Sequence, residues 1–206
     1  MPTDLADRAA DLLTAFEGWC DLVPPLTRPL ACLADACPVV LDAAQYERAA
    51  KLGLAGRVGA LQFDSVVFDG GRFEPAQHRE DQRFAEVAFL VPAINAEGEV
   101  FDVAAWVPET GKVASLLGEI GAMGVFDLDV ARLAPPLVHE SLRDWLLADE
   151  LGLFIVDPKI AADELDDVTL AAVDRDSALH LHSRLAPHVK RTPQIVVPRS
   201  DARRAG

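Results

Sequence analysis

Residues 84–116, FAEVAFLVPAINAEGEVFDVAAWVPETGKVASL, decide the fold class of this 206-residue chain. Aliphatic, β-branched and aromatic residues dominate the stretch, and two turn-forming segments, Asn95–Gly98 and Pro108–Gly111, divide it into three parts. Loops this short join neighbouring antiparallel strands. The stretch therefore predicts an antiparallel meander. Its strands are expected at 84–94, 99–107 and 112–116.

The residues before the meander predict helices followed by short strands. Leu5, Leu12 and Phe16 recur at helical spacing, and Pro24-Pro25 ends that pattern, which indicates a helix over 4–22. A second helix is expected over 43–52, with Asp42 and Gln45 as a capping pair and Gly53 just beyond its end. Strands are then expected at 60–63 and 65–68, a turn at Asp69-Gly70-Gly71, and an exposed polar loop at 75–83.

The residues after the meander alternate between strands and helices. Residues 117–136, which are rich in glycine and contain Pro135-Pro136, indicate an irregular connection with a strand at 125–128; the two prolines argue against a buried strand just before Glu140. Short links between the later elements favour parallel pairing with right-handed crossovers. Helices are expected at 141–150, 160–165 and 174–185, and strands at 152–156, 168–173 and 194–197.

The predicted fold class is α+β or mixed α/β. It combines N-terminal helices, a central antiparallel β-meander and a C-terminal βαβ-like portion. We expect residues 1–206 to form a single compact unit, divided at most into two lobes at 1–126 and 137–200, because half of the residues are hydrophobic and the chain only slightly exceeds a typical domain.

Charge narrows the partners that the protein can take. The net charge is −14, with a pI near 4.6, which opposes general binding to nucleic acid or to an anionic membrane. Residues 184–206 differ, because they hold six basic residues against Asp201 alone, a net of +5 that leaves −19 for the rest. Nucleic acid is therefore expected only through this basic segment, which is either a solubilising terminus or a binding patch for phosphate or a partner. Its basic residues are Arg184, Lys190, Arg191, Arg199, Arg203 and Arg204.

The sequence favours a cytoplasmic location. Its first residues are acidic and lack the basic start and apolar stretch of a secretory signal, and the longest apolar runs are too short to cross a bilayer. Three cysteines, Cys20, Cys32 and Cys37, are an odd number in a chain of this size, so we expect free thiols rather than disulfides. A metal or redox role for them is the alternative.

One pattern points to chemistry. The apolar segment Val168–Val173 is followed at once by Asp174 and Asp176 and then by a helix. Carboxylates just past the carboxyl end of a parallel strand lie where open α/β sheets bind ligands, and carboxylate oxygens are ligands that suit Mg²⁺. The structural alternative is that Asp174 caps the helix while Asp176 lies in its first turn.

Residues 137–198 resemble, in the order of these elements, the toprim domain of primases and topoisomerases. The resemblance implies Glu140 as the acid/base residue and Asp174 and Asp176 as a Mg²⁺-binding pair for phosphoryl transfer on nucleic acid. Two positions depart from the family pattern: Ser141 stands where a glycine usually follows the glutamate, and the glycine usual after the acidic pair is missing.

The histidines offer weaker patterns. His180 and His182 are two residues apart in a predicted helix, which places them on different faces, so we expect both to be solvated rather than to share a metal. His139 beside Glu140 would be an acid/base pair only if the fold brings their side chains together.

Three functions remain open at this stage. The run 101–111, with 141–146 and 154–158, looks like uncharacterised proteins of bacterial mobile elements. The leading hypothesis is a non-enzymatic accessory protein, associated with a replication or mobile-element system, whose partner is another protein and not a membrane. The second is the Mg²⁺-dependent toprim-like enzyme. The third is a small-molecule-binding protein with a pocket between the meander and the C-terminal lobe.

Overall fold

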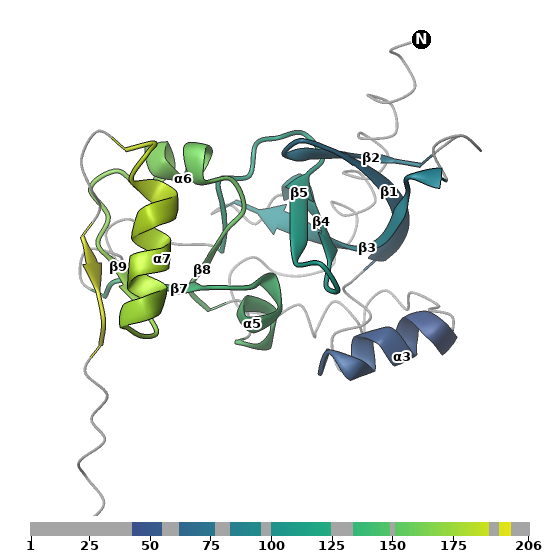
Figure 1. Cartoon of the computed structure of the whole chain (residues 1–206), viewed down its shortest axis with the longest axis horizontal. Helices are drawn as coiled ribbons and strands as arrows, with labels where there is room; N and C mark the ends of the chain where they lie inside the picture. The colour runs from purple at the N-terminus through teal and green to yellow at the C-terminus, as the bar shows by residue number, and fades with distance from the viewer. Residues whose placement is uncertain are drawn as a thin grey trace, which may run out of the picture.

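Two long strands of the quoted stretch, β3 (Glu86–Ile94) and β4 (Val100–Val107), lie at the centre of the computed structural model (Figure 1). The structure describes residues 43–54, 62–76, 83–95, 100–124, 134–148, 151–189 and 194–198. Strand β4 pairs antiparallel with β3 on one side and with β5 (Lys112–Ser115) on the other. The predicted meander is therefore confirmed.

The meander closes into a barrel, which the sequence did not predict. Strands β1 (Gln62–Asp69) and β2 (Arg72–Pro75) form a hairpin, and β1 pairs antiparallel with β3 while β2 pairs parallel with β5. The strand order around the barrel is β1-β2-β5-β4-β3. The predicted turn at Asp69-Gly70-Gly71 connects the hairpin, but the two short strands expected before it are one continuous strand.

Apolar side chains from every strand fill the barrel. Because neighbouring residues of a strand point to opposite faces, alternate positions of β3 and β4 point inward and the others point outward. The inward set forms one buried cluster. Its members are Val66, Phe73, Ala88, Leu90, Val100, Val103, Ala105, Val107, Ala114 and Leu116.

The described residues after the barrel form a second sheet with the order β10-β9-β7-β8-β6. All neighbours are parallel except β6, which is antiparallel to β8, so the predicted parallel α/β portion is confirmed and the protein is of the α+β class. The strands are β6 (Ala122–Met123), β7 (Leu137–His139), β8 (Leu153–Ile155), β9 (Leu170–Ala172) and β10 (Ile195–Val196). The helices between them are α5 (Leu142–Leu147), α6 (Pro158–Glu164) and α7 (Arg175–Leu185).

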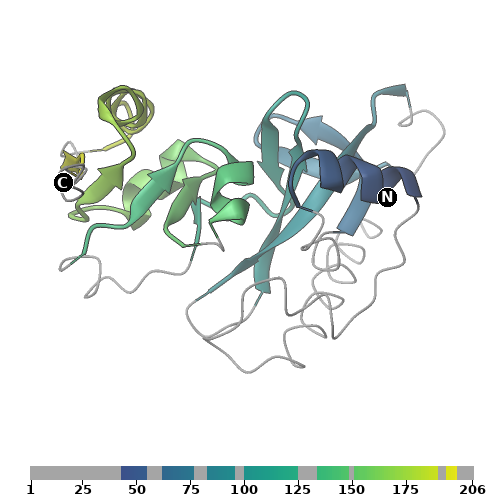
Figure 2. The same cartoon turned by 90° about the horizontal axis from the view of Figure 1, so that it is seen from below.

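Helices α5 and α7 begin at the predicted caps, whereas α6 begins at Pro158, two residues before the predicted start at Ile160. Ser141 caps α5 by accepting the amide of Asp144, Asp157 caps α6 and Asp174 caps α7. Helices α6 and α7 cover one face of the second sheet, whereas α5 lies on the face towards the barrel (Figure 2). None of the helices in the described ranges is long and apolar enough to span a membrane.

Strand β7 corrects the expectation drawn from Pro135-Pro136. It lies between β8 and β9, in the interior of the sheet, although the two prolines precede it directly. Both prolines stay outside the strand, and the carbonyl of Pro136 still accepts the amide of Ala171 at 2.9 Å. A proline removes a donor but keeps its acceptor, so the pair marks the start of the strand instead of preventing it.

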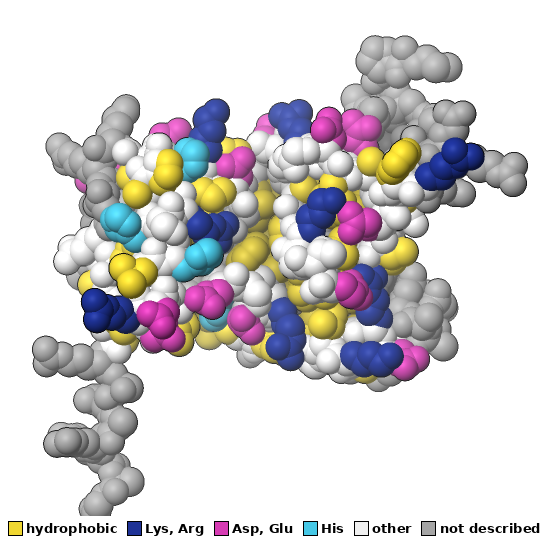
Figure 3. All heavy atoms as spheres, in the orientation of Figure 1, with side chains coloured by type: hydrophobic (Ala, Val, Ile, Leu, Met, Phe, Trp, Pro, Cys, Tyr) yellow, Lys and Arg dark blue, Asp and Glu magenta, His cyan; other side chains and the backbone are white. Residues whose placement is uncertain are grey.

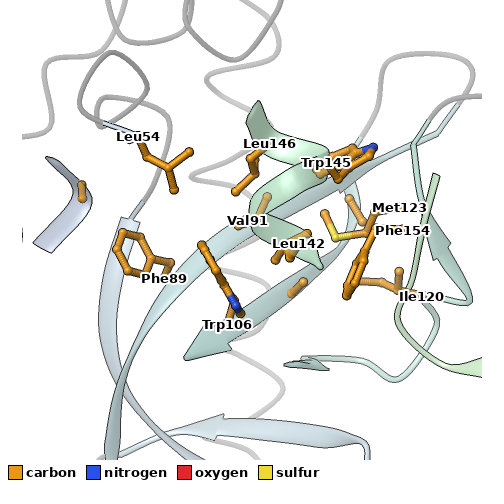
Figure 4. Close-up of a cluster of buried hydrophobic side chains, with 13 residues drawn as sticks. Leu54, Phe89, Val91, Trp106, Ile120, Met123, Leu142, Trp145, Leu146 and Phe154 are labelled. Carbon is orange, nitrogen blue, oxygen red and sulfur yellow. The ribbon is translucent and has the colours of Figure 1, made fainter. Parts of the chain in front are cut away.

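The barrel and the second sheet share one buried core (Figure 4). Phe89 and Trp106 are cross-strand partners on the outer face of the barrel, with ring centroids 5.4 Å apart. They belong to the same cluster as Trp145 of α5 and Phe154 of β8. Burying each such side chain contributes about 1.5–3 kcal/mol, so β3 and β4 are stabilised from both of their faces. The cluster comprises Ala49, Leu54, Phe89, Val91, Ala93, Ala104, Trp106, Ile120, Met123, Leu142, Trp145, Leu146 and Phe154.

Helix α3 (Ala43–Lys51) confirms the predicted second helix, and Gly53 follows it with a positive φ of 79°. Arg48 fastens α3 to the barrel: its guanidinium makes two hydrogen bonds to the carboxylate of Glu109, at 2.7 and 2.5 Å, and a third to the carbonyl of Val87 at 2.9 Å. The helix expected over 4–22, the Asp42–Gln45 capping pair, the three cysteines and the strand expected at 125–128 lie outside the described residues.

Two carboxylates hold the segment that links β5 to β6. Asp102 of β4 is fully buried and accepts the backbone amides of Leu117 at 2.9 Å and Glu119 at 3.0 Å. Glu164, at the end of α6, accepts the amides of Gly121 and Ala122. The link between the two sheets is thus held by one acidic side chain from each side.

Candidate functional site

The carboxyl edge of the second sheet brings together the two elements that carry the predicted acidic residues. Strands β7 and β9 are parallel neighbours, with Leu137 paired to Ala171 and Val138 paired to Ala172. Continuing this register by two residues places Glu140 level with Asp174, each just past the end of its strand. The toprim resemblance had implied a role for both residues, whereas Pro135-Pro136 had argued against a strand before Glu140.

Asp174 acts as a helix cap. Its Oδ1 atom accepts hydrogen bonds from the backbone amide and the hydroxyl of Ser177, both at 2.8 Å. These bonds stabilise the charged carboxylate and hold the pKa of Asp174 below its usual value. Asp176 lies exposed in the first turn of the same helix, and Glu140 is also exposed. The structural alternative for Asp174 and Asp176 is therefore realised.

The carboxylates of Glu140, Asp174 and Asp176 do not converge on a common metal position in this structure. Within the described ranges, no group of three His, Cys, Asp or Glu side chains is placed to hold a metal ion, so Glu140, Asp174 and Asp176 do not form such a group. The edge holds one carboxylate just past each of two neighbouring strands and a third in the first turn of α7. Mg²⁺ binding by these residues stays a prediction.

His139 and Glu140 lie on opposite sides of their strand end. The imidazole of His139 is buried, and its Nε2 atom is 2.8 Å from the carbonyl oxygen of Leu151. Gly152 follows that carbonyl with a φ of 85°, and a Cβ there would lie 3.3 Å from Nε2. The ring of His139 thus packs against the turn before β8, whereas Glu140 faces solvent, so the two do not form an acid/base pair in this arrangement.

The outer face of α7 carries features that the sequence patterns did not single out. Leu179 is 59% exposed, and Val173, just before the helix, is 60% exposed. His180 and His182 are exposed as expected, and Figure 3 shows histidine side chains gathered over the part of the molecule that contains α7. A signal for Leu179 was available, because it falls outside the stripe of Ser177, Leu181 and Leu185 that α7 buries.

Arg184, the first residue of the basic segment, lies at the far end of α7 and is half-buried. Its Nη2 atom donates to the carbonyl of Ile155, the last residue of β8, at 3.1 Å. Burial lowers the pKa of its guanidinium. The other basic residues of that segment fall outside the described residues.

The chain matched no protein-family model, no curated protein and no solved structure.

Proposed function

We propose that this protein is a non-enzymatic accessory protein that acts in the cytoplasm by binding another protein. The observation that supports this is the exposure of large apolar side chains on the α/β portion, among which Val173 and Leu179 lie beside and on α7. Exposed apolar side chains mark a contact surface where they form a contiguous patch. Others of this portion are Leu147, Leu151 and Val197.

The dense packing between the two sheets argues for a binding site on the surface of the protein and not between the sheets. A small-molecule pocket at this contact would need space that Phe89, Trp106 and Trp145 occupy, and all three are at most 3% exposed. The barrel interior is likewise filled by its own side chains. A partner would therefore bind the outer surface, behind which the core is filled. The association with a replication or mobile-element system rests on the sequence resemblance alone.

Site-specific photo-crosslinking in cells tests this function. A benzophenone amino acid at position 179 should give a discrete adduct with one protein after irradiation, because that side chain lies at the proposed contact. The matched control carries the same group at Asp69, which is exposed at the end of β1 in the barrel. The same adducts at both positions, or none at position 179, would overturn the proposal.

The toprim-like enzyme is a second candidate, favoured by the parallel pairing of β7 with β9 that sets Glu140 level with Asp174. Carboxylates at this edge have the oxygen donors that Mg²⁺ prefers. Against it stands the capping role of Asp174, whose Oδ1 already accepts two hydrogen bonds from Ser177.

A metal titration separates the two candidates. Amide NMR shifts are followed while Mg²⁺ or Mn²⁺ is added to the wild type and to the double variant Asp174→Asn/Asp176→Asn. Saturable changes at residues 140 and 174–178 that disappear in the double variant would favour the enzyme and justify nuclease and primase assays. Unchanged spectra at millimolar metal would remove this candidate and leave the binding function in place.

A further inference from the structure

We propose that Arg184 anchors an oxyanion, a phosphate or carboxylate group of a bound molecule, at the carboxyl end of β8. The guanidinium extends from the last turn of α7 and contacts the last residue of that strand, Ile155, through one hydrogen bond of 3.1 Å. The ligand crevice of parallel α/β sheets lies at this end of the strands.

The charge of Arg184 has no counter-charge among the described residues. The protein has 33 Asp and Glu against 19 Lys and Arg, yet no described carboxylate makes an ion pair with this guanidinium. Burial is the single cause of its lowered pKa, with no acidic neighbour to offset it. A half-buried cation without a charged partner has lost part of its hydration, and a bound anion compensates for that loss.

Two acidic residues lie near this strand end. Glu140 is level with Ile155 on the neighbouring strand but makes no ion pair with the guanidinium, and Asp157 is already engaged. Asp157, two residues after Ile155, is the N-cap of α6, and its Oδ1 accepts the amide of Lys159 at 2.7 Å. Its carboxylate stabilises the helix and leaves the guanidinium unpaired. An arginine has five N–H donors in a planar fork that suits the two oxygens of a carboxylate or phosphate, and one of these donors is used on Ile155.

Helix α7 adds a second group on the same side. His180 lies one turn before Arg184, at the i and i+4 spacing that brings side chains together on a helix surface. It is exposed and offers a further hydrogen-bond donor on that part of the helix. One guanidinium on an acidic protein favours a compact anion over an extended polyanion.

An NMR titration with inorganic phosphate and, separately, with glutarate tests this site, at constant ionic strength set with sodium chloride. We expect saturable shifts of the Arg184 side-chain N–H signal and of the amides of Ile155 and Val156. Saturation by phosphate alone identifies a phosphate group as the ligand, and saturation by both anions identifies the wider oxyanion class. No saturable shift with either anion at tens of millimolar would overturn the proposal.

Two variants make the assignment specific. Arg184→Gln should weaken binding by about tenfold or more, because the charged fork is lost. Arg175→Gln, an exposed arginine of the same helix, is the matched control and should leave binding unchanged. Equal loss in both variants would show general charge screening and would contradict a site at Arg184.

A third variant guards against a folding defect. If circular dichroism shows that Arg184→Gln is unfolded, Arg184→Lys is used, because lysine keeps the charge and a donor for the Ile155 carbonyl. This variant should bind about threefold or more weakly, since a single ammonium cannot reproduce the planar fork. Wild-type affinity in Arg184→Lys would overturn the role assigned to the guanidinium.

Discussion

The backbone N–H of Leu117 donates to the carboxylate of Asp102 over 2.9 Å, and this bond ties the link between the two sheets to strand β4 of the barrel. The same carboxylate accepts the amide of Glu119 at 3.0 Å and that of Val103 at 2.7 Å. A fully buried carboxylate that accepts three amides is satisfied without a cation. It fixes where the chain leaves the barrel for the second sheet.

Replacing Asp102 with asparagine should lower the free energy of unfolding by about 1–3 kcal/mol. The new amide nitrogen is a donor, so one backbone N–H that faced a carboxylate oxygen loses its acceptor. Urea unfolding at neutral pH measures the loss. Asp163→Asn, an exposed change on α6, is the control and should stay within about 0.5 kcal/mol of wild type. Similar values for both variants would contradict the role of Asp102.

The Arg48–Glu109 pair should stabilise α3 on the barrel by a measurable but small amount. A double-mutant cycle with Arg48→Met and Glu109→Gln should give a coupling of about 0.5–1 kcal/mol, because the pair is bidentate but the Glu109 side chain is 57% exposed. The coupling should shrink in 1 M sodium chloride, since salt screens exposed charges. A coupling that is independent of salt would argue for packing of Arg48 instead of its charge.

The same pair should respond to acid. The hydrogen bond from Arg48 lowers the pKa of Glu109 in the folded protein. Its contribution is therefore fully present above the usual pKa of 4.5 and is lost as pH falls through the lowered value. Thermal unfolding followed from pH 7 down to pH 3 should show a steeper loss for the wild type than for Glu109→Gln. Parallel curves would contradict this expectation.

The contribution of Glu164 to stability should depend on pH in the opposite sense. Although the residue as a whole is exposed, its carboxyl group lies against the backbone of Gly121, and this burial raises its pKa despite the bonds from Gly121 and Ala122. Its contribution is fully present below the usual pKa of 4.5 and is lost as pH rises through the raised value. Glu164→Gln should flatten this part of the stability profile between pH 4 and neutrality; the wild-type slope persisting in the variant would refute it.

Substitutions at Gly152 and Gly111 compare the effect of steric crowding on stability at two positions with a similar backbone conformation. Both have positive φ, 85° and 70°, so alanine carries a similar backbone cost of about 1 kcal/mol at each. A Cβ at Gly152 would lie 2.2 Å from the carbonyl oxygen of Leu137, whereas one at Gly111 has nothing within 4 Å. Gly152→Ala should therefore destabilise the protein clearly more than Gly111→Ala in urea unfolding. Equal losses would mean that β7 shifts at little cost.

Local patterns in the sequence predicted most of the elements but not how they close. The turn at Pro108–Gly111 and the caps Ser141 and Asp174 act over a few residues, so the strands and helices that they bound could be located from the sequence. The parallel pairing of β2 with β5 joins Arg72 to Ser115, far apart in the sequence. Such a contact leaves no local pattern in the sequence. Because this pairing closes the barrel, the barrel could not be predicted.

The candidate site shows the same division. That Asp174 follows a strand could be predicted, because it lies directly after the apolar run 168–173. The strand before Glu140 was not expected, because Pro135-Pro136 precede it. That the strands are neighbours depends on β7 pairing with β9. The environment of Arg184 could not be predicted either, since it depends on the end of β8 meeting α7. Sequence spacing locates residues on elements, and tertiary packing decides which of them meet.

The core that joins the two sheets also makes the halves of the chain complementary fragments. A backbone cut between residues 124 and 134 would leave Phe89 and Trp106 on one piece and Trp145 and Phe154 on the other, all of which belong to the same buried cluster. Each fragment would then expose aromatic side chains that pack against those of the other fragment. Co-expressed halves should associate as the fragments of a split protein do, whereas either half expressed alone would be prone to aggregate.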